Sequence, residues 1–225
     1  PAGKGNKVHA VSGISFDARA GETVGLVGES GCGKSTTGRA IMQLPPPTSG
    51  SIRFDGVELT DLDDEELRRT RTRLQMIFQD PISSLNPRRK VRDIVAEGLD
   101  IWKVDGDSKV AVDRVLENVG LDPELVGGRR PHEFSGGQCQ RICVARALVM
   151  DPTIIICDEP VSALDVSIQA QILNLLESMK QRYGLTLLFI AHDLAVVKNV
   201  SDRVVVMYLG KICEVAAPDR LFAHP

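Results

Sequence analysis

A strand, a glycine-rich loop and a helix follow one another near the amino terminus, and this order constrains the fold more than any other feature. The apolar run Thr23–Val27 predicts a short buried strand, and Lys34–Leu44 predicts a helix that stops before three prolines. Between them, Gly28–Thr36 fits the pattern G-x-x-x-x-G-K-[ST]. A strand that leads through such a loop into a helix predicts an α/β core whose loop binds phosphate groups.

Each residue type in this loop has a physical task. Glycines allow tight backbone turns, so that successive N–H groups converge on phosphate oxygens. Lys34, where the helix starts, supplies a flexible positive charge for the β- and γ-phosphates, and the Ser35 hydroxyl is placed to coordinate Mg²⁺. We therefore predict that the loop binds ATP with Mg²⁺. The residues predicted to do so are Gly28, Ser30, Gly31, Cys32, Gly33, Lys34, Ser35 and Thr36.

The rest of the chain alternates strand-like and helical segments, which predicts an α/β fold with a mainly parallel sheet and an antiparallel β part near the amino terminus. Further strands are predicted at Ile14–Phe16, Ser51–Phe54, Leu74–Phe78, Thr153–Cys157, Leu185–Ala191, Arg203–Met207 and Lys211–Val215. Residues 91–150 contain only helical patterns, with Asp107 or Ser108 as one helix cap and Gly136–Met150 as a second helix. We expect them to form a helical subdomain inserted into a core made of residues 1–90 and 151–225.

Charge and cysteine content narrow the functional class. The chain has 225 residues and a net charge of −3, so its overall charge does not predict binding to nucleic acid. The basic clusters Arg68–Arg73 and Arg88–Lys90 are interpreted as a solvated helix face and a loop. Five cysteines without a CxxC pair predict reduced thiols in a cytosolic protein. The longest apolar run, Leu187–Ala191, is far shorter than the roughly 20 residues of a membrane-spanning helix.

Two adjacent carboxylates follow the apolar strand Thr153–Cys157. Acidic residues at that position lie at the carboxyl edge of a parallel sheet, where open α/β folds bind ligands. Adjacent strand residues point in different directions, so the two carboxylates need not share one role. We predict that Asp158 binds Mg²⁺, directly or through water, and that Glu159 is the general base for the attacking water. The alternative is a solvated strand end.

A second glycine pair opens the helix that follows Phe134. Phe134–Gln138 (FSGGQ, the signature segment) offers free N–H groups and a hydroxyl to an anion, although alone it would more often be a plain helix cap. In combination with the loop at residues 28–36, it resembles the nucleotide-binding domain of ATP-binding cassette (ABC) transporters, whose signature is LSGGQ. Phe134 replaces the family's leucine, and Cys139 stands where the family often has a basic residue.

The resemblance covers nearly the whole chain and gives roles to residues that would otherwise be interpreted as structural. Gln79 ends the strand Leu74–Phe78 and resembles the Q-loop glutamine, which senses Mg²⁺ and the water. Ser162–Asp165, the D-loop segment, resembles the family's D-loop, and His192 resembles the switch histidine that contacts the γ-phosphate. The resemblance thus implies that Gln79, Lys34, Glu159 and His192 are catalytic, and that Gln79 joins Ser35 and Asp158 at the metal.

In that family, two domains face head to tail around two ATP molecules. The resemblance implies that Ser135, Gly136, Gly137 and Asp165 bind the nucleotide of a second ATPase domain. Residues Gln79–Arg88 (QDPISSLNPR) resemble the importers of oligopeptides, dipeptides and nickel, and Cys157–Ser167 supports the same group. This implies transmembrane permease subunits as partners, an extracytoplasmic solute-binding protein as an indirect partner, and a peripheral position at the cytoplasmic face of the membrane.

Two other classes of function remain as alternatives to peptide or nickel import. A soluble cassette ATPase of DNA repair or translation predicts coiled-coil insertions or basic surfaces, and a regulatory module without turnover predicts a degenerate site. The sequence has neither pattern. We also expect the chain to be a fragment, for example one half of a tandem ATPase. Residues 1–13 lack an aromatic partner for adenine, and the sequence stops at Pro225, where peptide importers continue.

Overall fold

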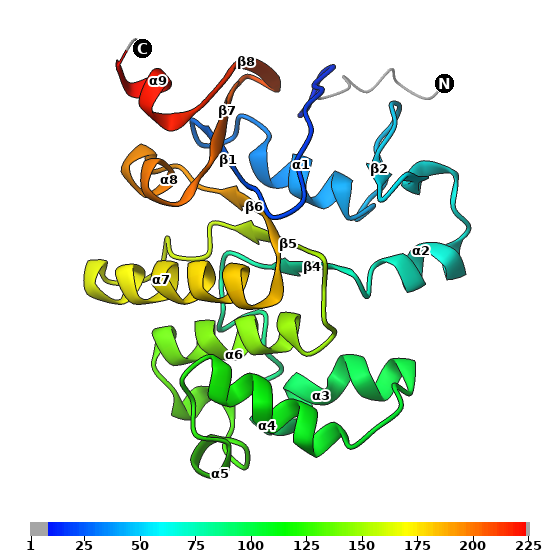
Figure 1. Cartoon of the computed structure of the whole chain (residues 1–225), viewed down its shortest axis with the longest axis vertical. Coiled ribbons are helices and arrows are strands. Elements are labelled where there is room, and N and C mark those ends of the chain that lie inside the picture. The colour runs from blue at the N-terminus through cyan, green and yellow to red at the C-terminus, as the bar shows by residue number, and fades with distance from the viewer. Residues whose placement is uncertain (1–8, 224–225) are drawn as a thin grey trace, which may run out of the picture.

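A six-stranded sheet forms the centre of the molecule in a computed structural model, which describes residues 9–223 except the side chain of Phe222 (Figure 1). The strand order is β4-β5-β6-β1-β7-β8, and all neighbours are parallel except the antiparallel pair β7 and β8. The strands are β1 (Thr23–Gly28), β4 (Leu74–Ile77), β5 (Ile154–Asp158), β6 (Thr186–Ile190), β7 (Arg203–Tyr208) and β8 (Lys211–Ala216). The predicted α/β fold with a mainly parallel sheet is confirmed.

The central strands are apolar throughout because both faces of the sheet are covered. Ile156 packs into one hydrophobic core, and its neighbours Ile155 and Cys157 pack into the other. Helix α1 (Lys34–Ile41) contacts β1, β5 and β6, and α8 (Leu194–Val200) also packs against β1. This arrangement brings the carboxyl ends of β1, β4, β5 and β6 to one edge of the sheet.

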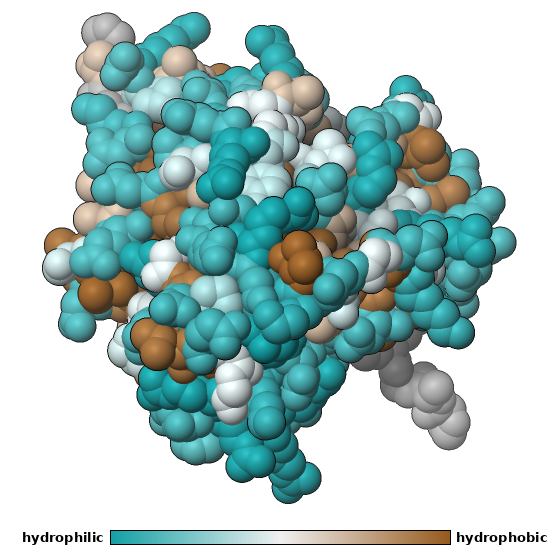
Figure 2. All heavy atoms as spheres, turned by 60° about the horizontal axis from the view of Figure 1, so that its bottom comes forward, coloured by the Kyte–Doolittle hydropathy of each residue, from teal (hydrophilic) through white to brown (hydrophobic). Residues whose placement is uncertain are grey.

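Four helices between β4 and β5 gather at one end of the molecule, at the bottom of Figure 1. They are α3 (Val91–Trp102), α4 (Ser108–Asn118), α5 (Pro123–Val126) and α6 (Gly136–Leu148). Asp107, not Ser108, caps α4, because its carboxylate accepts from the backbone of the first turn. Figure 2 brings this end forward and shows hydrophobic side chains scattered among hydrophilic ones. The boundaries of a separate subdomain at residues 91–150 stay a prediction.

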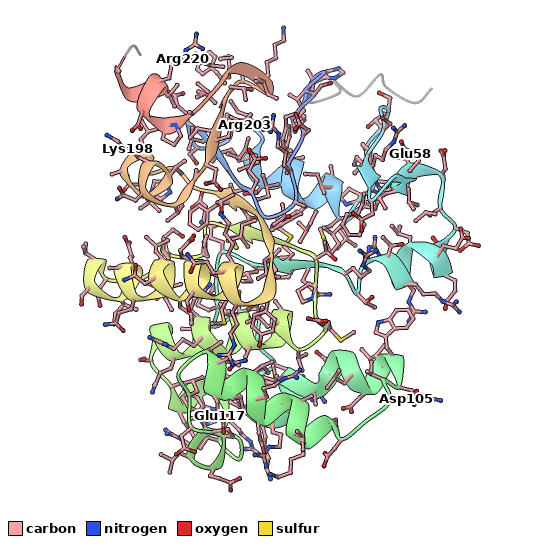
Figure 3. The ribbon with its side chains drawn as sticks, in the orientation of Figure 1. Glu58, Asp105, Glu117, Lys198, Arg203 and Arg220 are labelled. Atoms are coloured by element: carbon pink, nitrogen blue, oxygen red, sulfur yellow. The ribbon has the colours of Figure 1, made fainter. Side chains whose placement is uncertain are left out.

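The antiparallel part near the amino terminus is smaller than the sequence suggested. It consists of β2 (Arg53–Phe54) and β3 (Val57–Glu58), which pair with each other. The predicted strand at Ile14–Phe16 is wrong. Both side chains pack against the core, as their alternation indicates, but the segment joins no ladder. Its neighbour Asp17 is instead held by Arg203, labelled in Figure 3, whose guanidinium donates to the Asp17 carbonyl.

Helix ends also differ from the sequence pattern. The predicted helix Lys34–Leu44 ends at Ile41, three residues earlier than expected. Helices α8 and α9 (Pro218–Ala223) were not predicted. The remaining helical elements are α2 (Asp64–Thr70), α7 (Val166–Tyr183) and the 3-10 turns Leu59–Asp61 and Pro131–Glu133. Among residues 9–223, no helix combines the length and apolar character needed to cross a membrane. Residues 1–8, included in the predicted core, lie outside the described part.

Candidate functional site

A polar cavity lies where the loops after β1, β4, β5 and β6 meet, because parallel strands place their carboxyl ends at the same edge. Its volume is about 480 Å³. The lining residues are Ala10, Ser30, Gly31, Gly33, Lys34, Ser35, Thr36, Gln79, Glu159 and His192. The fold therefore gathers the glycine loop, Gln79, Glu159 and His192 around one space, although they are up to 162 residues apart in the chain.

The glycine loop has the geometry of an anion cradle. Gly31 and Gly33 have φ of 80° and 105°, which favour glycine. Gly33 caps α1 and has no side chain to accept from the first helical turn, so those N–H groups remain available to an anion. Lys34 folds back over the loop, and its Nζ donates to the carbonyls of Gly28 at 2.8 Å and Glu29 at 2.9 Å. The Cys32 side chain is buried, so only its backbone could contact a phosphate.

The two predicted metal ligands nearest the loop contact each other directly. Ser35 Oγ donates to Asp158 Oδ1 at 2.7 Å, and Asp158 is only 2% exposed. Burial raises the pKa of the Asp158 carboxyl, and the hydrogen bond from Ser35 opposes this shift. Mg²⁺ prefers oxygen ligands and is usually held by one or two carboxylates together with phosphates and water. Ser35 and Asp158 therefore fit a Mg²⁺ ion that also binds the nucleotide.

The Glu159 carboxylate contacts two other predicted site residues. Gln79 Nε2 donates to Glu159 Oε2 at 3.0 Å, and His192 Nδ1 lies 3.3 Å from the same oxygen. The backbone N–H of Glu159 donates to Ile190 at 3.0 Å, and its φ of 48° is rare for a residue with a side chain. Such strained conformations cluster at functional sites. The two adjacent carboxylates thus have separate surroundings, as the sequence predicts.

The signature segment does not line this cavity. Ser135 caps α6 through two reciprocal bonds, from Gln138 N to Ser135 Oγ at 3.3 Å and from Ser135 N to Gln138 Oε1 at 3.0 Å. Within this chain, therefore, Ser135 acts as a plain helix cap. Ser135 is exposed and Gly136 and Gly137 are half-buried, so an anion approaching from outside the chain could reach this helix start.

Asp165 also lies outside the cavity. It precedes α7 as the N-cap residue, yet its side chain makes no capping hydrogen bond, and it is exposed. Aspartate in this position normally accepts from the first helical turn. Asp165 and Ser135 are thus two exposed polar residues at helix starts that the lining of the cavity does not include.

Three contacts near the site were missed from the sequence. Ala10 lines the cavity, and its carbonyl lies against Gly33, where an added Cβ would be 2.4 Å away. Beyond Gln79, the loop is fastened to α6, because Arg146 Nη1 donates to the Ser84 carbonyl at 2.7 Å and Ser84 Oγ lies 3.3 Å from Cys143 Sγ. These contacts join residues far apart in the chain, and no local pattern signals them.

Comparison with known proteins identifies the family of the chain. The family model described as ABC transporter matches residues 11–162. The oligopeptide transport ATP-binding proteins OppF and AppF of Bacillus subtilis are 55% and 52% identical to the chain. Each alignment covers 97% of the chain, with 72% of OppF and 67% of AppF.

Solved structures show the same fold. CbiO1 from Clostridium perfringens, part of the ABC transporter complex CbiONQ, aligns with a TM-score of 0.85 and 30% identity over 96% of this chain and 84% of its own. The ATP-binding cassette MJ0796, a dimer in a post-hydrolysis state bound to ADP and Pi, aligns with a TM-score of 0.82 and 30% identity over 93% of this chain and 90% of its own. The chain belongs to the ABC transporter family and is an ATP-binding cassette with the fold of an ABC ATPase.

Proposed function

We propose that the chain is the ATP-hydrolysing subunit of a peptide importer, in which Glu159 activates the water that attacks the γ-phosphate. One observation carries the assignment of the base. The Glu159 carboxylate, 16% exposed, lines the same cavity as Lys34 and Ser35, and its Oε2 accepts from Gln79 and lies 3.3 Å from His192 Nδ1. Among residues 9–223, no contact to the other oxygen, Oε1, competes with water, so Oε1 would accept the proton.

The other site residues would bind the phosphates and the metal ion during phosphoryl transfer. Lys34 and the N–H groups of the glycine loop bind the β- and γ-phosphates, because positive charge and a helix start together stabilise an anion. Ser35, Asp158 and Gln79 would hold Mg²⁺, which neutralises the charge that develops on the phosphate oxygens. Water attacks the γ-phosphorus, the bond to the β–γ bridging oxygen breaks, Glu159 takes the water's proton, and ADP and phosphate leave.

A second ATPase domain completes each site in this proposal. Ser135, Gly136, Gly137 and Asp165 belong to the predicted nucleotide site but do not line the cavity of their own chain, and Ser135 and Asp165 are exposed. A head-to-tail pair would bring them to the ATP bound by the other domain. The dimeric state of MJ0796 with ADP and Pi supports this arrangement. ATP would then hold the two domains together, and its hydrolysis would shift the pair towards an open form.

Similarity to oligopeptide transport proteins favours peptide import as the process that this chain powers. OppF and AppF are oligopeptide transport ATP-binding proteins, and CbiO1 is part of a transporter complex. We infer that transmembrane permease subunits bind this chain at the cytoplasmic face of the membrane and that a solute-binding protein delivers peptide to them from the other side. The chain itself need not touch the peptide.

The test is Glu159→Gln, which keeps the shape and the hydrogen bond from Gln79 but removes the base. Steady-state ATP hydrolysis should fall about 10²- to 10⁴-fold, whereas ATP affinity should stay within about twofold. Glu117→Gln, an exposed glutamate of α4 (Figure 3), is the matched control and should hydrolyse like the wild type. Both measurements use the chain reconstituted with its permease. Undiminished hydrolysis by Glu159→Gln would remove Glu159 as the base.

A further inference from the structure

The two glycines of the signature segment are not required by their own backbone. Gly136 and Gly137 begin α6 with ordinary helical geometry, whereas the positive-φ glycines of the cavity loop need theirs. Glycine inside a helix is less favourable than alanine. The space around the two residues must therefore explain their presence.

The D-loop segment and the first turn of α7 fill that space. A Cβ at Gly137 would lie 2.6 Å from Ile168 Cγ2, and a Cβ at Gly136 would lie 3.3 Å from Leu164 Cδ2. The first distance is far inside van der Waals contact. Ile168 cannot easily turn aside, because a β-branched side chain in a helix has one strongly preferred rotamer. Gly137 is thus a glycine because Ile168 of the same chain occupies the position of its side chain.

Leu164 and Ile168 are themselves held in place. Both pack against the main hydrophobic core, and so does Phe134 of the signature segment. Gln169 Nε2 donates to the Leu164 carbonyl at 2.9 Å, and Leu164 N donates to Val161 at 3.1 Å. The chain then leads back to Glu159, whose carbonyl accepts from Ser162 Oγ at 3.1 Å. Short bonded steps therefore link Glu159 to the residues that touch the signature glycines.

We propose that Ile168 is a positioning residue, which through its contact with Gly137 fixes the start of α6 against the D-loop segment. Ser135 and Asp165 then face outward as one rigid unit. The consequence for turnover rests on the function proposed above. Glu159 acts in the site of its own chain, while Ser135 serves the site of the partner, so this contact connects the two sites within one chain. Loss of the contact should loosen Ser135 without altering the cavity around Lys34.

The contact can be tested by combining a substitution at Gly137 with two substitutions at Ile168, one that removes the branch at Cβ and one that keeps it. Gly137→Ala should clash with Ile168 and destabilise the start of α6. In the chain without nucleotide, hydrogen exchange of the amides at residues 138–141 should then become about tenfold faster. Adding Ile168→Leu, which removes Cγ2 and keeps the volume, should restore exchange to within about twofold of the wild type. Adding Ile168→Val, which keeps Cγ2, should not restore it.

Equal exchange in the Leu and Val double variants, or no change in Gly137→Ala, would overturn the proposal. If Gly137→Ala does not fold, Ile168→Ala alone replaces it, and faster exchange at residues 138–141 with unchanged exchange in α3 supports the contact. Unchanged exchange at both places contradicts it. Because these measurements need no ATP, the contact can fail while ATP hydrolysis stands, and the reverse can also be observed. ATP turnover of the same variants, measured with the permease, then shows whether Ser135 depends on Ile168.

Discussion

The cavity loop at residues 28–36 and the signature segment share one feature, a helix start that can attract an anion, but they differ in the residues that surround it. Both offer a helix start with glycine nearby, yet the first is surrounded by Lys34, Gln79, Glu159 and His192 of its own chain. The second is closed by the reciprocal bonds between Ser135 and Gln138, and it packs against side chains of α7 and the D-loop segment. One helix start is assembled within the chain, and the other is presented to the outside.

The glycines show the same contrast. Gly31 and Gly33 are glycines because their φ angles require it, with values of 80° and 105°. Gly137 has helical geometry and is a glycine because Ile168 leaves no room. A substitution in the loop therefore strains the backbone, whereas a substitution at Gly137 acts through a neighbour that can itself be changed. The comparison teaches that glycine in two similar motifs can have two different physical causes, and variants can separate them.

Among the variants that test this comparison, Lys34→Ala should have the largest effect, a loss of ATP affinity. Hydrogen bonds to charged groups contribute about 1.5–3 kcal/mol each, so ATP affinity should fall roughly 10- to 100-fold. Isothermal titration with ATP and Mg²⁺ measures this. Lys90→Ala, which removes an exposed lysine before α3, is the control and should bind as the wild type does. An affinity for ATP that Lys34→Ala leaves unchanged would contradict the assignment of the cavity.

An intermediate effect is expected from Ser135→Ala. Binding of ATP to the chain should be unchanged, because Ser135 does not line the cavity, while turnover should fall about tenfold if Ser135 serves a partner's nucleotide. Loss of the helix cap costs about 1 kcal/mol of stability in any case. Asp107→Ala, which removes the cap of α4, has the same cost without touching an anion site and is the matched control.

Dependence of turnover on protein concentration gives an independent check of the shared site. If each site needs a second domain, specific activity should rise with concentration and then level off. A specific activity that stays constant from nanomolar concentrations upward would show that the cavity works alone. It would also remove the reason for distinguishing the two helix starts.

Local sequence predicted the cavity loop because strand, loop and helix are continuous in the chain. Here the structure differs by a strand that extends to Gly28 and a helix that ends earlier, at Ile41. Gln79 and His192 are different. Each follows an apolar strand, but only the pairing of β4 with β5 and of β5 with β6 brings them to Glu159. The residues alone left both as structural, and the family resemblance was needed to give them roles.

The wrongly predicted strand at Ile14–Phe16 and the unpredicted helix α8 have one cause. Ile14 and Phe16 alternate and face the core, which is the strand pattern, but a strand also needs a partner, and no sequence pattern names the partner. The segment Leu194–Val200 is rich in β-branched residues, which favour strands, yet it is a helix capped by Asp193 and packed on β1. Tertiary contacts decide both segments. The packing of Gly137 on Ile168 is of the same kind.

The smallest effect concerns Phe134, which replaces the family's leucine. The Arg129 guanidinium lies 4.5 Å from the centre of the Phe134 ring, and such a cation–π contact contributes about 0.5–1 kcal/mol when exposed. Phe134→Leu should therefore lower the melting temperature by about 1–4 °C and leave ATP affinity unchanged. Arg129→Ala and the double variant complete a cycle, in which a coupling energy of zero would show that the two side chains do not interact. A measurable coupling energy would show that the contact between the Arg129 and Phe134 side chains helps to hold the signature segment in place.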